Sequence, residues 1–188
     1  MILVTGIGNE ERKYYRTRHN TGYFAVSIMR EALRYEGFMS DNGFRYKKNL
    51  LSDIAVAKWQ TITEVILQKN KTSMNTAGEA VKRAFDKYNP EEFVLFHDDL
   101  DIKLGDFKIQ KGKSPKCHNG VKNVEEKLGT KDFWRVRIGI DSRDEDNKIP
   151  GEKYVLKKFN KEEFEIMKGT CVRACDDLMF TELFEKWL

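Results

Sequence analysis

Histidine and acidic side chains that could carry acid–base chemistry gather in short polar stretches of this chain. Residues 97–101 read HDDLD and follow the apolar run 93–96. His19 and His118 lie in two further polar stretches. Functional side chains of open α/β folds collect where buried strands end. We therefore expect the strand 93–96 to end at His97, and all three histidines are candidates for one shared cleft.

The 97–101 stretch fits two kinds of chemistry. Its nitrogen and oxygen atoms suit a divalent metal, as in a metal-dependent phosphoesterase. Alternate strand residues point to opposite faces, so these side chains converge on one ion only if the chain turns at once. Alternatively, Asp98 orients the ring of His19 and makes it a general base. Clustered carboxylates at strand ends are also common as solvated loop residues or caps.

Asparagines form a second pattern, because Asn9, Asn75 and Asn119 each lie at a predicted boundary of a strand or helix. Asparagine at such positions is commonly a turn or cap residue. Around a histidine and an aspartate, however, amides can orient water and donate hydrogen bonds to a carbonyl oxygen that becomes anionic. Both interpretations stay open for each asparagine.

Gly6 and Gly8 follow the first predicted strand, as in a dinucleotide-binding loop. The third glycine of that motif would fall at Glu11, whose carboxylate would repel a pyrophosphate. The two glycines instead indicate a tight turn that presents Asn9.

Basic residues are dense on one predicted edge strand, the loop after it and the next helix. The net charge is only +4, from 34 basic and 30 acidic residues, so the placement of the charges matters more than their sum. Such runs are usually solvated faces, but beside a site they can bind a phosphate backbone. The residues are Lys108, Lys111, Lys113, Lys116, Lys122 and Lys127.

Hydrophobic periodicity predicts alternating strands and helices. Four helices are expected to begin near Thr21, Thr76, Asn119 and Asn160, with Thr21 as an N-cap and capping boxes at the second and fourth. This order predicts a single α/β domain over residues 1–188, with a central mixed β-sheet flanked by α-helices on both faces. The expected strands are 2–7, 44–48, 53–59, 61–68, 93–96, 104–111 and 135–140.

Composition limits the class of protein. A hydrophobic fraction of 40% is typical of a folded, globular chain, and 188 residues suffice for one core. The chain has 3 cysteines without CxxC spacing, which argues against a disulfide framework or a zinc site and for a reducing compartment. No apolar run approaches the roughly 20 residues that span a bilayer. We expect a soluble intracellular protein with no membrane segment or leader peptide.

Five short motifs occur in order: TRHNTG at 17–22, MNxxG at 74–78, HDDLD at 97–101, HNG at 118–120 and LGTxDF at 128–133. Together they closely resemble the bacterial-type peptidyl-tRNA hydrolase family. Their intervals fit as well, so the resemblance covers nearly the whole chain. It implies a monomeric α/β esterase that works without metal or cofactor, in the cytoplasm or in mitochondria. Such an enzyme cleaves the ester between a peptide and the 3′-terminal ribose of tRNA and thereby recycles the tRNA.

The resemblance also implies roles for individual residues. His19 matches the catalytic base that activates water, and Asp98 matches its orienting partner. Other residues match those that hold the peptide and the terminal adenosine: Asn9, Tyr14, Met74, Asn75 and Asn119. The expected contacts to tRNA phosphates are Lys111, Lys113, Lys116 and Arg135 or Arg137.

The chain departs from the family pattern in two loops. The usual Asn-Pro-Gly after the first strand is Asn9, Glu10 and Glu11 here, and the usually glycine-rich loop before His118 contains Lys113 and Pro115. Neither change removes a proposed catalytic group, which predicts an active enzyme. A noncatalytic RNA-binding relative is the first alternative, and a metal-dependent phosphoesterase is the second.

Overall fold

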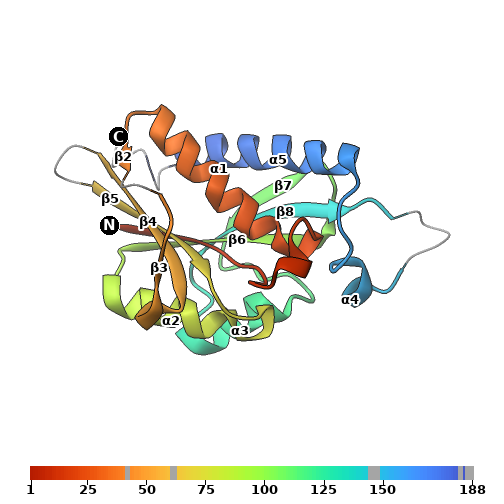
Figure 1. Cartoon of the computed structure of the whole chain (residues 1–188), viewed down its shortest axis with the longest axis horizontal. Helices are drawn as coiled ribbons and strands as arrows, with labels where there is room; N and C mark the ends of the chain where they lie inside the picture. Colours follow the sequence, from red (N-terminus) through yellow and green to blue (C-terminus); the bar gives the residue numbers. More distant parts are fainter. Residues whose placement is uncertain (41–42, 60–62, 144–148, 182–183, 185–188) are drawn as a thin grey trace.

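The computed structural model describes residues 1–40, 43–59, 63–143, 149–181 and 184. These residues contain one sheet of eight strands in the order β2-β4-β5-β1-β6-β8-β7, with β3 paired to β4 (Figure 1). Strands β1, β5, β6 and β8 run parallel, and the outer strands are antiparallel, so the sheet is mixed. The strands are β1 Ile2–Gly6, β2 Met39–Ser40, β3 Arg45–Lys47, β4 Ser52–Trp59, β5 Thr63–Asn70, β6 Glu92–Lys103, β7 Phe107–Lys111 and β8 Trp134–Asp141.

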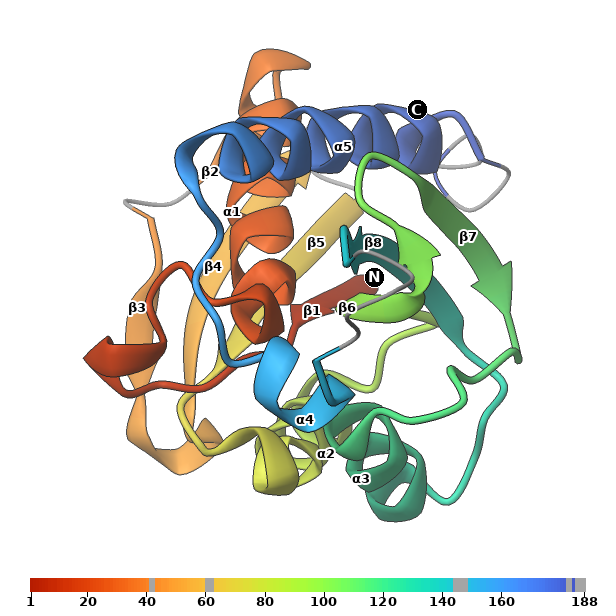
Figure 2. The same cartoon turned by 90° about the vertical axis from the view of Figure 1, so that its right-hand side faces the viewer.

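Helices cover both faces of the sheet, as the sequence predicted. Helices α1 and α5 pack on one face and α2 and α3 on the other, which gives two separate apolar clusters (Figures 1 and 2). The predicted fold class, a single α/β domain with a mixed sheet, is confirmed. The helices are α1 Thr21–Tyr35, α2 Ala77–Tyr88, α3 Asn119–Leu128, α4 Gly151–Tyr154 and α5 Lys161–Met179.

The central strand β1 meets the start of α1 at very short range. A Cβ atom on Gly6 would lie 2.0 Å from the carbonyl oxygen of Gly22, and one on Gly22 would lie 2.5 Å from the carbonyl oxygen of Phe96. Only residues without a side chain allow this approach. The first turn of α1 is thereby pressed against the carboxyl ends of β1 and β6, where the functional side chains lie.

Strand β6 is longer than predicted. It was expected to end at residue 96, but it continues to Lys103, and Asp98 pairs with Ile138 of β8. The prediction was wrong because polar residues can continue a strand when buried partners satisfy them. His97 and Asp98 therefore lie within a central strand, and their side chains point to opposite faces. The four ionisable side chains of 97–101 do not converge on one point.

The predicted helices are present and begin where expected, but two of the expected side-chain caps were wrong. The hydroxyl of Thr21 donates to the carbonyl oxygen of Arg18 and does not cap α1, which is preceded by a 3-10 turn. The hydroxyl of Thr76 donates to the carbonyl oxygen of Ser73 and does not cap α2, and Glu79 pairs with Arg83. The box predicted for Asn160 is confirmed at the start of α5.

Several loop predictions were coarse. The strand expected over 104–111 begins only at Phe107, because a turn at Gly105 precedes it. The short helix α4 lies just before the segment 155–160 and was not predicted. No helix in the described ranges combines the length and apolarity needed to cross a membrane.

Candidate active site

His19 and Asp98 lie in contact although 79 residues separate them. Asp98 projects from β6 and is buried, and the Nδ1 atom of His19 lies 3.0 Å from each of its carboxylate oxygens. A carboxylate only accepts hydrogen bonds when ionised, so Nδ1 carries the proton and the lone pair is on Nε2. His19 also lines a cavity of about 410 Å³. The pair has the arrangement that a histidine base requires.

The backbone around His19 is attached to the segment that follows α4. The amide of His19 donates to the carbonyl oxygen of Val155 over 2.8 Å. Its neighbour Arg18 is buried, forms a 2.5 Å ion pair with Glu163 and lies over the ring of Tyr154. This role of Arg18 was not predicted, because its partners lie about 140 residues further along the chain. These contacts hold the 3-10 turn Arg18–Asn20 against the start of α5.

A second histidine binds the same carboxylate. The Nε2 atom of His118 lies 3.0 Å from Oδ1 of Asp98, and the amide of Val121 donates to Nδ1 of His118 over 3.2 Å. Because Nδ1 accepts, Nε2 carries the proton and donates it to Asp98. His118 was predicted to face a shared cleft, but no role was assigned to it. The HNG motif at the start of α3 was the only signal in the sequence.

The two histidines determine the charge of Asp98. Burial alone would raise the pKa of the Asp98 carboxyl, but His19 and His118 beside it lower that pKa far below its ordinary value of 3.8. Burial lowers the pKa of His19, whereas the charge and hydrogen bond of Asp98 raise it, and the net direction is upward from 6.5. Asp98 is thus an anion at neutral pH, and it makes the Nε2 atom of His19 more basic.

His97 lies outside this pair but touches it. It is fully buried, and its Nδ1 atom lies 2.7 Å from the carbonyl oxygen of Asp98, to which it donates. Its ring packs edge-on against that of His118, with 5.2 Å between centroids. Burial and the neighbouring His118 lower the pKa of His97 to about 3, so the ring is neutral. Among the described residues, its Nε2 atom has no hydrogen-bond partner.

Among the described residues, the side chains that lie close enough together to hold a metal ion are those of this site. Ligand atoms of His19, Asp98 and His118 all lie within 4.8 Å of one another. Both nitrogen-to-oxygen distances are 3.0 Å, and the amide of Val121 fixes the proton of His118 on the nitrogen that faces Asp98. An ion would have to displace both of these protons. The geometry is therefore that of a hydrogen-bonded network around a carboxylate.

The cavity brings some predicted site residues together and leaves others outside. Asn119 and Lys116 line it with His19 and Asp98, and Leu100 and Val155 add apolar surface. Predicted residues that are not among its lining are Asn9, Tyr14, Met74 and Asn75.

Asn9 and Met74 instead support the wall next to the cavity. The Oδ1 atom of Asn9 accepts a 2.8 Å hydrogen bond from the amide of Met74, and the backbone of Asn9 makes two bonds with the side chain of Asn20. A Cβ on Gly120 would lie 2.3 Å from the sulfur of Met74. Asn9 thus connects the turn after β1 to the start of α3, which carries His118 and Asn119. Asn75 is exposed and Tyr14 is half-buried.

The prediction that Arg135 or Arg137 contacts tRNA phosphates was wrong. Arg135 is completely buried and forms a 2.7 Å ion pair with Glu125 of α3. Arg137 is 7% exposed and pairs with Asp99 over 2.7 Å. Both arginines lie on β8, a strand covered on both faces, so their charges are neutralised inside the protein and do not reach a polyanion.

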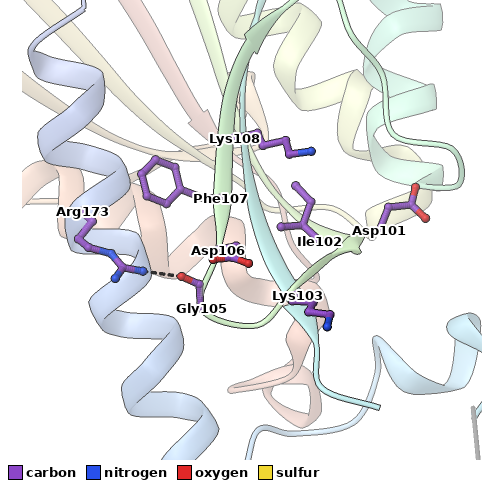
Figure 3. A pocket seen from close by; sticks show the side chains of 8 residues that line it. All are labelled: Asp101, Ile102, Lys103, Gly105, Asp106, Phe107, Lys108 and Arg173. Atoms are coloured by element: carbon purple, nitrogen blue, oxygen red, sulfur yellow. Dashed lines mark hydrogen bonds between the residues drawn. The ribbon is translucent and has the colours of Figure 1, made fainter. Parts of the chain in front are cut away.

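The predicted basic residues of β7 and its loop are on the surface. Lys111, Lys113 and Lys116 are all exposed, and so is Lys108. A hollow of about 500 Å³ lies at the turn between β6 and β7 (Figure 3). There Phe107 points toward Arg173 of α5, whereas Lys108 points to the other side of the strand (Figure 3). The exposed lysines therefore form a basic surface that extends from the loop at 112–118 along β7.

Comparisons with known proteins agree on one family. The family model described as "Peptidyl-tRNA hydrolase" matches residues 3–186. A curated peptidyl-tRNA hydrolase of Bacillus cereus strain Q1 is 34% identical over 190 residues, which covers 100% of this chain and 93% of the relative. That of Campylobacter concisus is 34% identical over 167 residues, covering 87% of this chain and 79% of the relative.

Solved structures show the same fold. A peptidyl-tRNA hydrolase from Acinetobacter baumannii superposes with a TM-score of 0.83 at 24% identity, and the match covers 100% of this chain and 90% of that one. The family model extends over nearly the full length and includes all five motifs of the sequence. The chain belongs to the peptidyl-tRNA hydrolase family.

Proposed function

We propose that this chain hydrolyses the ester that joins a peptide to the 3′-terminal ribose of tRNA. The observation that carries this proposal is the 3.0 Å contact of His19 with the buried Asp98 at the edge of a cavity. A histidine held in this way can take a proton from water in the presence of a neutral ester. Membership of the family supplies the substrate class.

In the proposed reaction, the Nε2 atom of His19 accepts a proton from water as its oxygen attacks the ester carbonyl carbon. The amide of Asn119 donates to the carbonyl oxygen while negative charge develops on it. The bond from carbon to the ribose oxygen then breaks, and His19 returns the proton to that oxygen. Asp98 keeps its negative charge throughout and stabilises the imidazolium.

The remaining roles follow the placement of each residue. Met74 and Asn75 adjoin the start of α3 and bind the peptide or the terminal adenosine, and Tyr14 lies at the rim. Asn9 acts through Met74, whose amide it holds. Exposed Lys111, Lys113 and Lys116 contact tRNA phosphates. We further propose that residues 1–188 act as one domain and as a cytoplasmic monomer without metal or cofactor; the family match over 3–186 supports the single domain.

The alternative functions are less favoured. A metal phosphoesterase needs the acidic stretch at 97–101 to converge, but Asp99 is paired with Arg137, and His97 faces away from Asp98. A noncatalytic RNA-binding relative has no need of a histidine oriented by a buried carboxylate. The comparisons favour neither alternative.

Hydrolysis of a purified peptidyl-tRNA by the wild type and by His19→Ala tests the proposal. Loss of a general base lowers the rate about 10²- to 10⁴-fold. Arg34→Ala, an exposed α1 residue paired only on the surface with Glu31, is the matched control and keeps wild-type turnover. Equal turnover by the wild type and His19→Ala would rule out the mechanism, and strict dependence on added Mg²⁺ after EDTA would favour the phosphoesterase.

A further inference from the structure

A second cavity, of about 680 Å³, is lined in part by the hydrogen-bonded pair Asn9 and Asn20, and His19 is not among its lining residues. It is enclosed by the loop after β1, the first half of α1, and strands β4 and β5. Aromatic rings of Tyr15, Tyr23 and Phe24 form part of its wall. The proposed hydrolysis does not use this cavity.

Lys69 of β5 lines this cavity and has an unusual environment. It lies opposite Asp53 of β4 in the sheet register, and its amine is over the ring of Phe44, 4.1 Å from the centroid. Within the part of the chain that the structure describes, this amine has no hydrogen bond or ion pair. By contrast, Lys71 lines the same cavity and forms a 3.0 Å ion pair with Glu10.

The surroundings of Lys69 favour the neutral amine. Burial lowers its pKa from 10.5 to about 8; Asp53 opposes this shift, whereas Arg30 and Lys71 add to it. Other charged groups at the cavity are Glu10, Glu11 and Arg12. A desolvated lysine next to other cations is the usual form of an amine that attacks carbonyl carbon.

We propose that Lys69 is a covalent binding site for small aldehydes, which it takes up in this cavity as a reversible imine. The amine nitrogen attacks the carbonyl carbon, and the resulting carbinolamine loses water. A carbon–nitrogen double bond replaces the carbon–oxygen one, and both amine hydrogens leave with the oxygen. No oxidant or reductant is needed. Aldehydes with an apolar or aromatic substituent fit best, because Tyr15, Tyr23 and Phe24 line the cavity.

Trapping with salicylaldehyde tests the site. The full-length protein is incubated at pH 7.5, the imine is reduced with borohydride, and labelled peptides are quantified by mass spectrometry. At this pH an amine with a pKa near 8 is unprotonated roughly 200 times more often than an ordinary lysine, so Lys69 is labelled at least about tenfold faster than Lys71. Lys69→Arg removes this fast labelling, and Lys71→Arg retains it.

Two further measurements separate the pocket from general lysine reactivity. Asp53→Asn removes the group that holds the Lys69 pKa up, so the pH of half-maximal labelling moves downward. In 8 M urea, the preference for Lys69 over Lys71 disappears, because the cavity is lost. Equal labelling of Lys69 and Lys71 in the folded protein, or a preference that persists in urea, would overturn the proposal. Peptidyl-tRNA hydrolysis is not part of this readout.

Discussion

Asp98 is the residue on which the site depends, because one carboxylate accepts hydrogen bonds from two histidines. His19 and His118 approach it from different parts of the fold, at 3.0 Å each. Of these two histidines, His118 uses its second nitrogen to accept a hydrogen bond from Val121, whereas the Nε2 atom of His19 has no hydrogen-bond partner among the described residues. In this network His19 is therefore the base, whereas His118 orients the carboxylate.

The substitution Asp98→Asn tests whether the charge of Asp98 makes His19 more basic. Because Asp98 raises the pKa of His19, the neutral amide removes that effect, and burial then lowers the pKa. We expect the acid limb of kcat/KM to move to lower pH, while the plateau falls by at least about tenfold because the ring loses its orientation. A pH profile of peptidyl-tRNA hydrolysis measures both effects. An acid limb that stays in place would show that another group controls it.

The buried His97 makes the free energy of unfolding depend on pH. Its folded pKa of about 3 lies below the ordinary value of 6.5, so below pH 6.5 the unfolded chain binds a proton that the folded chain does not. This group therefore lowers the free energy of unfolding by about 2 kcal/mol between pH 7 and pH 5. His19, whose pKa is raised, acts in the opposite direction.

Urea unfolding of the wild type and of His97→Asn at pH 7 and pH 5 measures this contribution. Asparagine can still donate to the carbonyl oxygen of Asp98 but does not titrate. The loss of stability on acidification is thus about 2 kcal/mol smaller in the variant than in the wild type. The same pH dependence in both proteins would contradict the neutral, buried state of His97.

At the residue scale, the sequence predicted the His19 and Asp98 pair but not its surroundings. Residue type and the family motifs suffice to select those two side chains. Arg135 and Arg137 were misinterpreted because arginines that alternate with apolar residues are typical of a strand with one solvated face. Both faces of β8 are covered, however, and the buried carboxylates of Glu125 and Asp99 neutralise the two arginines. Pairings of this kind depend on neighbours that are distant in sequence.

At the scale of elements, the site depends on how the turn Arg18–Asn20 is attached to α5. Arg18 is buried between the ring of Tyr154 and the carboxylate of Glu163, which also caps α5 through Asn160. One acidic side chain therefore connects the start of α5 to the turn that carries His19. Movement of either element would displace the His19 ring from Asp98.

Arg18→Gln should reduce both stability and activity. Removing one member of a largely buried ion pair leaves Glu163 without its charge partner, and we expect a loss of about 3 kcal/mol in the free energy of unfolding. The value of kcat/KM falls as well, because His19 is less well held. Urea unfolding and peptidyl-tRNA hydrolysis measure the two effects. Arg34→Gln, which breaks only a surface pair on α1, changes stability by less than about 1 kcal/mol.

Helices were predicted from sequence better than the central strand. Apolar residues at helical spacing identified α1, α2, α3 and α5, because each helix buries one face. The extension of β6 through residues 97–103 could not be read from the sequence, since its polar side chains are satisfied by His19, His118 and Arg137. Strands β4 and β5 were found close to their true positions because their apolar residues are continuous.

At the scale of the whole molecule, charge distribution determines how the proposed substrate binds. The exposed lysines of β7 and its loop lie beside the cavity, while the arginines of β8 are neutralised internally. A basic surface next to the cavity that contains His19 suits a ligand with a charged backbone and an ester at its end. Affinity and chemistry should therefore be separable by mutation.

Charge reversal of Lys111 and Lys113 to glutamate tests that separation. We expect weaker tRNA binding and a salt dependence reduced by about 2 in log–log slope, because two phosphate contacts are lost. Cleavage of a minimal peptidyl-adenosine ester stays close to wild type. Reversal of Lys58 and Lys168, which lie on other faces, is the control with the same net charge. An equal loss on both substrates would place the two lysines in the catalytic cleft or in folding.

The position of β1 in the sheet has a consequence for synthesis of the chain. This strand is made before both of its neighbours, because β5 and β6 follow it by about 60 and 90 residues. A nascent chain that stops before residue 92 lacks one of these partners and cannot bury the apolar side chains of β1 on both sides. The domain therefore folds only after most of its length has emerged, and a truncated product would stay exposed to chaperones and proteases.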